Sequence, residues 1–205
     1  METNPQYYPY GETEIQALAK KDPKLGQAIK DIGMIRREVK TDLFSSLISS
    51  VVSQQISNKA YATVWSRIVT AVGDLTPKNI LSIPREDLKA CGLSYKKTDW
   101  IQSIAQAVDD GSFDLESLTS LSDEDVIREL IRLPGIGKWT AEMLLIFSLQ
   151  RPDILSYGDL AIRRGIQKLY GLDKLSKNDF ESIRQRLSPY NTVASLYFWE
   201  LSKTD

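Results

Sequence analysis

The sequence predicts an all-α protein of about ten helices. Three observations support this fold class. Apolar residues recur at helical spacing in one segment after another. Ser, Thr, Asp, Pro and Gly stand where those segments begin and end, as helix caps and breakers do. The chain lacks the sustained alternation and the turn dipeptides that indicate β-hairpins, so no strand of substance is expected.

The N-terminal part of the chain begins with a Pro- and Tyr-rich tail over residues 1–11. A helix is expected over 12–30, and Asp22-Pro23 should divide it into two pieces. The next helix, over 42–53, is the most apolar of the first half, and Thr41 or Asp42 can cap it. It leads into a polar junction, Ser53-Gln-Gln-Ile-Ser57, before a helix over 59–72 capped by Ser57 or Asn58.

Three further helices are expected before residue 110. The first two begin at Thr76-Pro77 and at Pro84, since Pro is favoured in the first turn of a helix. The third should run from about Asp99 to Asp109, with Lys96 and Lys97 at its start. The positive end of a helix disfavours cations, so these lysines suggest an anion outside the helix. Solvated surface charge is the alternative.

A helix over 123–132 leads to the most distinctive turn of the chain. Ser122 and Asp125 fit a capping box, and Pro134 ends the helix. Gly135 and Gly137 allow tight backbone geometry and close approach of another chain. The next helix starts near Lys138 and ends near Gln150. Bare N–H groups at its start would form an anion site suited to phosphate, although an ordinary helical corner gives the same pattern.

The C-terminal part continues the helical pattern. After Asp159 a helix is expected from about 160 to 169, stopped by Gly171, and another over 178–187. Ser188-Pro-Tyr190 separates it from a last helix that carries Leu196 and Trp199.

Composition narrows the classes of protein to consider. The net charge is −1 and the isoelectric point is near 5.7, so any nucleic-acid site must be a local patch. One cysteine, Cys91, excludes an internal disulfide and sites built from several cysteines, and there is no histidine. No apolar run is long enough to cross a membrane, and no signal peptide is visible. We therefore expect a monomer in the cytoplasm, or in the nucleus of a eukaryote, without membrane contact.

Three motifs together resemble the helix-hairpin-helix DNA glycosylases, and within them the 3-methyladenine DNA glycosylase II branch of alkylation repair. They are the turn Leu133-Pro-Gly-Ile-Gly-Lys-Trp-Thr-Ala141, the loop Ile154-Leu-Ser-Tyr-Gly-Asp-Leu-Ala-Ile-Arg-Arg-Gly165 and the junction 53–57. The similarity covers roughly residues 12–205. It implies one glycosylase domain over 1–205 with two helical lobes, about 42–150 and about 12–41 plus 151–205. The active-site cleft would lie between the lobes, as in compact relatives without an N-terminal α/β domain.

Asp159 is the expected catalytic carboxylate. Cleavage of an N-glycosidic bond passes through an oxocarbenium-like sugar, which a carboxylate stabilises, and the same group can orient a water. From position alone Asp159 is a helix N-cap. The two interpretations are compatible, because the positive end of a helix favours an ionised carboxylate.

The resemblance also implies a base pocket lined by Trp139, Met143, Tyr157 and Trp199. Trp139 occupies the place where glycosylases that also cut the strand carry a nucleophilic lysine. Here the lysine is Lys138, about 100° around the helix, which predicts a monofunctional enzyme without lyase activity. An indole face attracts cationic alkylated purines. A core tryptophan is the alternative for both Trp139 and Trp199.

The target base must leave the helical stack, and a side chain must fill the gap. Gln55 is the expected wedge, and Ile56 is the second candidate. Gln54 would either support the minor-groove loop or contact the opposite strand. The duplex backbone would be held by the turn and by nearby polar and basic residues, namely Gly135, Ile136, Gly137, Lys138, Thr140, Lys96 and Lys97.

No cofactor is expected to be required. Family members often hold a monovalent cation on carbonyls of this turn, so a Na or K ion could lie on the carbonyls of Ile131, Leu133 and Ile136. The expected partner is duplex DNA with alkylated bases. Two alternatives stay open, a glycosylase for deaminated or oxidised bases and a non-catalytic hairpin protein that binds only the DNA backbone.

Overall fold

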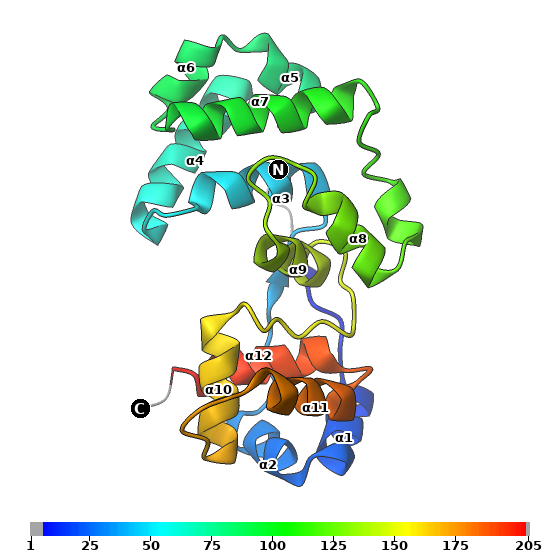
Figure 1. Ribbon diagram of the computed structural model, residues 1–205. Helices are drawn as coiled ribbons and strands as arrows, with labels where there is room; N and C mark the ends of the chain where they lie inside the picture. Colours follow the sequence, from blue (N-terminus) through cyan, green and yellow to red (C-terminus); the bar gives the residue numbers. More distant parts are fainter. Residues whose placement is uncertain (1–5, 204–205) are drawn as a thin grey trace. The chain divides into compact units, whose positions relative to one another are not determined.

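The computed structural model describes residues 6–203, which contain twelve α-helices, one short 3-10 helix and two strands of two residues each (Figure 1). The predicted all-α class is confirmed. The expectation of no strand was wrong in one detail, because β1 (Gln6–Tyr7) pairs antiparallel with β2 (Glu38–Val39), with Gln6 opposite Val39. Strands this short cannot show alternation in the sequence. The chain divides into two compact units, Met1–Val39 with Leu145–Asp205 and Lys40–Leu144.

The unit Lys40–Leu144 begins with its most buried helix. In α3 (Leu43–Ser53), Leu47, Ile48, Val51 and Val52 are fully buried. Asp42 caps it by accepting a hydrogen bond from the Ser45 N–H at 3.1 Å. The remaining elements of this unit are α4 (Asn58–Val72), α5 (Pro77–Ser82), α6 (Arg85–Ala90), α7 (Tyr95–Asp109), the 3-10 helix η1 (Ser117–Ser120), α8 (Asp123–Leu130) and the first part of α9 (Lys138–Phe147).

One helix of this unit begins earlier than the sequence predicts. α7 starts at Tyr95 rather than near Asp99, because the Ser94 hydroxyl accepts a hydrogen bond from the Lys97 N–H at 3.3 Å and caps the helix. The first turn therefore contains Lys96 and Lys97. The segment between α7 and α8 contains η1.

The other unit is built around α12 (Asn191–Leu201), in which every residue from Asn191 to Phe198 is buried. Around it lie α1 (Glu12–Lys21), α2 (Pro23–Ile32), α10 (Leu160–Tyr170) and α11 (Lys177–Leu187). α12, orange-red in Figure 1, runs beside the yellow α10. The two helices are in backbone contact at Gly165, where a Cβ would lie 2.0 Å from the Phe198 carbonyl oxygen. The Pro- and Tyr-rich tail contributes Tyr8 to the core of this unit.

A buried carboxylate joins three helices of this unit. Asp22 caps α2 through the Leu25 N–H at 3.0 Å, and its other oxygen accepts hydrogen bonds from the Tyr170 hydroxyl at 2.6 Å and the Arg186 guanidinium at 2.7 Å. Burial alone would raise the pKa of Asp22. The hydrogen bonds from Tyr170, Leu25 and Arg186 and the positive charge of Arg186 outweigh burial, so the pKa of Asp22 is lowered.

None of the helices described over residues 6–203 combines the length and the apolar composition needed to cross a bilayer.

Candidate active site

The turn between α8 and α9 has the geometry expected of an anion site. The Ile136 N–H donates to the Leu133 carbonyl at 3.2 Å, and the Gly137 carbonyl accepts from the Ala141 N–H at 2.9 Å as α9 begins. Gly137 and Lys138 are exposed, and a Cβ at Gly137 would meet no atom within 4 Å. The N-terminus of α9 is therefore exposed, as the binding of a phosphate at a helix N-terminus requires.

An aromatic ring packs against Gly135 of this turn. Its φ is +83°, and a Cβ at this position would lie 2.5 Å from Cε3 of Trp100 on α7. The Lys96 ammonium lies 4.8 Å from the centre of the same indole. Trp100 has no place among the sequence predictions, since a tryptophan eight residues after Gly92 carries no motif of its own. Only a glycine fits this turn against Trp100.

Asp159 is the N-cap of α10, as its position in the sequence predicts. Its Oδ1 accepts a hydrogen bond from the Ile162 N–H at 3.0 Å, and the carboxylate is 8% exposed. The preceding loop is bound to α12 by two polar side chains. The Thr192 hydroxyl accepts from the Ile154 N–H and the Ser195 hydroxyl donates to the Ile154 carbonyl, each at 3.0 Å. Asp159 therefore caps α10 on one side, and on the other it follows a loop that is anchored to α12 at Ile154.

Two aromatic side chains predicted for the base pocket belong to the same unit as Asp159. Tyr157 contacts Phe180 edge-on, with ring centres 5.1 Å apart. The Arg163 guanidinium lies 5.3 Å from the Tyr157 ring, and its buried Nε has no hydrogen-bond partner. Arg163 follows Asp159 by one helical turn, so sequence spacing could have singled it out.

Trp199 stacks on a different neighbour. Its indole lies 5.6 Å from the ring of Phe147, with 26° between the planes. The Arg37 guanidinium lies 5.0 Å from the Phe147 ring and 5.9 Å from Trp199. Arg37 precedes β2, and no local pattern in the sequence indicates its aromatic partners. The half-buried Trp199 thus packs against the core of this unit and is also part of a cation–aromatic stack.

Trp139 lies in the first turn of α9 with its side chain 48% exposed, so the interpretation as a core tryptophan was wrong. Met143, one turn later, is half-buried, and the Thr140 side chain between them is buried. The Lys138 ammonium lies 3.9 Å from the carboxylate of the buried Glu142, and the lysine side chain is 74% exposed. An exposed ammonium beside an anion lacks both of the environments that activate a lysine nucleophile, desolvation and a neighbouring cation.

The polar junction after α3 contains an unusual backbone conformation. Gln55 has φ +58°, the left-handed region that a non-glycine residue rarely occupies. Gln55 and Ile56 are exposed, whereas Gln54 is half-buried. The Gln54 side chain donates to the Gly135 carbonyl at 2.8 Å, which brings two separately predicted motifs together.

Lys97 has partners other than the external anion that its position suggested. Its ammonium donates to the carbonyls of Val52, at 2.9 Å, and Gln54, at 2.5 Å. The negative end of α3 thus takes the place of the anion. Burial lowers the pKa of Lys97. Lys96 keeps an exposed position.

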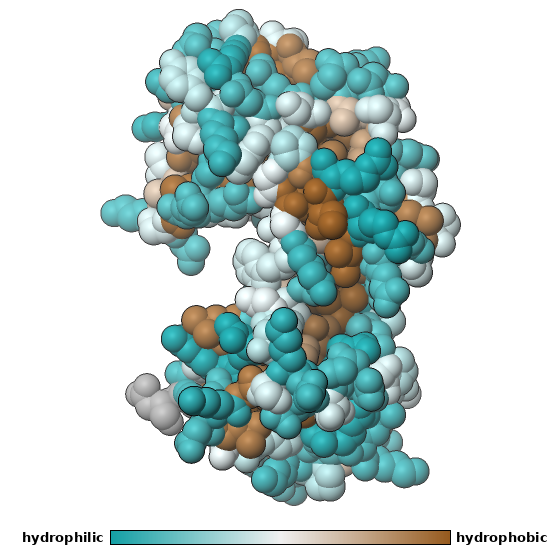
Figure 2. Space-filling view, viewed as in Figure 1, coloured by the Kyte–Doolittle hydropathy of each residue, from teal (hydrophilic) through white to brown (hydrophobic). Residues whose placement is uncertain are grey.

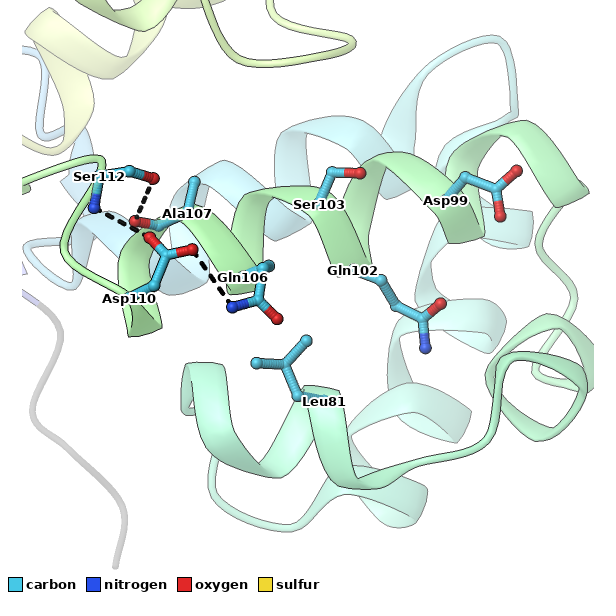
Figure 3. A pocket seen from close by; sticks show the side chains of 8 residues that line it. All are labelled: Leu81, Asp99, Gln102, Ser103, Gln106, Ala107, Asp110 and Ser112. Carbon is cyan, nitrogen blue, oxygen red and sulfur yellow. Dashed lines mark hydrogen bonds between the residues drawn. The ribbon is translucent and has the colours of Figure 1, made fainter.

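Some large apolar side chains remain exposed near the predicted site, and one open cavity lies away from it. Ile56, Ile131, Trp139 and Leu160 are large apolar residues that stay exposed at or beside the predicted site positions. On the face shown in Figure 2, hydrophilic residues predominate and apolar ones form smaller patches. An open cavity of about 610 Å³ lies between α5 and α7, lined mainly by polar residues of α7 (Figure 3). Its Asp110 carboxylate already accepts from Ser112 and Gln106, so this cavity has no evident chemistry.

No group of three or more acidic, cysteine or histidine side chains within residues 6–203 is placed to hold a metal ion. The predicted cation would instead use backbone carbonyls, the hard oxygen donors that Na and K ions take. The Leu133 carbonyl accepts one hydrogen bond, from Ile136, and keeps a second lone pair. The cation on the carbonyls of Ile131, Leu133 and Ile136 stays a prediction.

A protein-family model described as HhH-GPD superfamily base excision DNA repair protein matches residues 48–189. The chain belongs to this superfamily. The match covers the junction, the α8–α9 hairpin and the Asp159 loop, so the resemblance drawn from these motifs is confirmed.

Individual relatives agree with the family. DNA-3-methyladenine glycosylase 1 of Schizosaccharomyces pombe is 37% identical over 80% of this chain and 74% of its own length. The crystal structure of a DNA-3-methyladenine glycosidase from Bacillus halodurans superposes with a TM-score of 0.88 at 33% identity, covering 97% of this chain and 93% of that one. S. pombe 3-methyladenine DNA glycosylase (Mag1) in complex with abasic DNA gives a TM-score of 0.81 at 33% identity, covering 94% and 98%.

Proposed function

We propose that this protein is a DNA-3-methyladenine glycosylase that hydrolyses the N-glycosidic bond of flipped-out alkylated purines in duplex DNA and leaves the strand uncut. The observation that carries the proposal is the placement of Asp159. It is a buried carboxylate at the N-terminus of α10, on a loop fixed to α12, in a chain of the HhH-GPD superfamily. Relatives named for 3-methyladenine support the substrate class.

Asp159 acts on the sugar in this proposal. As the bond to the base lengthens, positive charge develops at the anomeric carbon, and the carboxylate stabilises that charge. The carboxylate accepts the cap hydrogen bond from Ile162 at Oδ1, and it can also orient a water for attack on the same carbon. The water oxygen bonds to the anomeric carbon and its proton passes to the Asp159 carboxylate and then to solvent. The cationic base leaves as a neutral purine with the electron pair of the broken bond, and an abasic sugar remains.

Trp139 selects the base. Its indole is exposed in the first turn of α9, where it can stack on a purine that has left the duplex. Alkylation at N3 or N7 makes the purine cationic and a good leaving group, so a π-face favours it and no general acid is needed. The absence of histidine from the sequence is consistent with this chemistry.

The absence of a lyase step follows from the residues of α9. Strand cleavage by a glycosylase needs an amine that attacks the sugar and forms a Schiff base. An indole stands at position 139, and the neighbouring Lys138 is exposed and paired with Glu142. Water is then the nucleophile, and the reaction ends at the abasic site.

The hairpin and the junction hold the DNA in this proposal. N–H groups around Gly137 bind a backbone phosphate, and Gln55 fills the space left by the flipped base. A Na or K ion on the carbonyls of Ile131, Leu133 and Ile136 would add positive charge beside that phosphate.

The test is base release from a panel of duplexes that contain 3-methyladenine, 7-methylguanine, ethenoadenine, hypoxanthine or an oxidised purine. We expect release of alkylated purines, with strand breaks only after alkali is added. If only deaminated or oxidised bases are released, the enzyme is a glycosylase for those lesions and not for alkylated purines. Strand breaks without added alkali would refute the assignment as a monofunctional enzyme. DNA binding without release of any base would favour the non-catalytic alternative.

A further inference from the structure

The strongest unexplained feature is a chain of contacts that joins three segments of the unit Lys40–Leu144. Lys97 on α7 contacts the end of α3, Gln54 contacts the hairpin, and Trp100 on α7 packs against Gly135 of the hairpin. Gln55 directly follows Gln54, the residue at which the first two contacts meet. Each contact links residues at least 35 positions apart, so together they fix the junction relative to the turn.

The end of α3 is where Lys97 acts. The last carbonyls of a helix have no partner inside the helix, and a cation near them is favoured by the helix dipole. Lys97 satisfies the carbonyl of Val52, in the last turn, and that of Gln54, the C-cap. Both hydrogen bonds lie immediately before Gln55, and they define the path on which the chain leaves the helix.

The Gln54 side chain also holds the backbone where it leaves α3. Its amide donates to the Gly135 carbonyl at 2.8 Å, and Gly135 cannot move toward α7 because Trp100 fills that space. The amide group is therefore used inside the protein. A side chain in this state holds the junction rather than reaching for a base.

Gln55 is the residue that these contacts control. It is exposed and has φ +58°, a conformation that costs free energy for a residue with a side chain. Such a conformation persists when the surrounding contacts over-determine it. Here the preceding residue is held by Lys97 at its carbonyl and by the hairpin at its side chain.

We propose that Lys97 and Gln54 are positioning residues that hold Gln55 in its wedge conformation at a fixed place beside the hairpin, and that neither contacts DNA. This inference rests on the proposed function only for the role of Gln55 as the wedge. It reassigns two residues for which the sequence suggested DNA contact.

The test is a set of binding measurements with Lys97→Met and Gln54→Met, which keep side-chain length and remove the hydrogen-bond donors. The two ligands are a duplex with a tetrahydrofuran abasic-site analogue and the same duplex undamaged. We expect each variant to lose roughly fivefold to tenfold of the preference for the analogue, the equivalent of about one hydrogen bond. Lys97→Arg, which keeps the charge and the donors, should restore most of the preference.

A double-mutant cycle with Gln55→Ala separates positioning from contact. If Lys97 and Gln54 act through Gln55, adding either methionine substitution to Gln55→Ala changes the preference by less than about twofold. An undiminished effect in that background would overturn the proposal. Gln54→Met leaves one backbone carbonyl without its donor, whereas Lys97→Met leaves two, so the Gln54 variant keeps the cycle measurable if Lys97→Met fails to fold.

The salt dependence of binding to the undamaged duplex gives an independent readout. A lysine that neutralises a phosphate contributes about 0.9 to the slope of log K against log salt, and a positioning lysine contributes nothing. Lys97→Met should leave the slope unchanged, whereas Lys96→Met, the exposed neighbour, is the matched control for a phosphate contact. A slope reduced by about 0.9 in Lys97→Met would refute the assignment. These measurements need no base release. They can therefore be interpreted even if the proposed substrate class is wrong.

Discussion

Substitution of Gly137 by Ala separates DNA binding from folding at the hairpin. A Cβ at this position meets no atom within 4 Å, and the backbone needs no left-handed conformation. Replacing Gly by Ala just before a helix costs up to about 1 kcal/mol of capping, and reduced freedom of the unfolded chain returns about 0.4–1 kcal/mol. The two effects oppose each other, so the free energy of unfolding should change by no more than about 1 kcal/mol.

DNA binding should respond far more strongly. A phosphate held by N–H groups at the start of α9 must approach the backbone closely, and the new methyl group occupies the open side of the turn. The loss of one hydrogen bond to a charged group costs about 1.5–3 kcal/mol, which corresponds to roughly a tenfold to 150-fold weaker Kd. The assays are urea unfolding and fluorescence anisotropy with a labelled duplex at fixed salt concentration.

Two other glycines supply the controls. Gly135→Ala combines left-handed strain of about 1–2 kcal/mol with overpacking against Trp100 of about 1–3 kcal/mol, so it should destabilise the fold. Gly73 has φ +73° and no atom within 4 Å of a built Cβ, so Gly73→Ala measures the cost of the left-handed backbone without overpacking. If Gly137→Ala binds the duplex within twofold of the wild type, the hairpin is not the phosphate site.

Two further predictions concern the unit that contains Asp159. Gly165→Ala should lower Tm by about 2–8 °C. The new Cβ would lie 2.0 Å from the Phe198 carbonyl oxygen, so α10 and α12 must separate until this contact exceeds 3.4 Å. An unchanged Tm would contradict this packing. Asp22→Asn should remove part of the acid sensitivity of folding. The pKa of Asp22 is lowered in the folded state, so its contribution to stability is present above about pH 4 and is lost as the pH falls from there through the folded pKa. The difference in urea midpoint between wild type and variant should shrink below pH 4, and a constant difference would count against this role.

The helices could be predicted from the sequence because their signals are local. Ser57, Ser122 and Asp159 cap the helices expected of them, and the periodicity of α3 marks its buried face. The start of α7 was placed too late, because Tyr95 and Lys96 hide the apolar pattern while the decisive cap is the hydroxyl of Ser94. The pairing of β1 with β2 depends on residues far apart in the chain, and no local pattern encodes it.

The candidate site could be predicted only in part. Motif spacing identified Asp159, Trp139 and the hairpin glycines as the residues to examine. The partners of Lys97 are backbone carbonyls, which leave no trace in side-chain identity. The exposure of Trp139 was equally invisible, since an indole on an apolar helix has the same pattern whether it faces the core or solvent.

The most direct test of the proposed function is single-turnover release of 3-methyladenine by Asp159→Asn. Asn is as good an N-cap as Asp and can keep the hydrogen bond from Ile162, so the variant should match the wild type in stability and in affinity for an abasic-analogue duplex. Loss of the negative charge should slow base release by about 10²–10³-fold. A folded variant that binds the duplex and releases the base at the wild-type rate would contradict the assignment of Asp159 as the catalytic carboxylate.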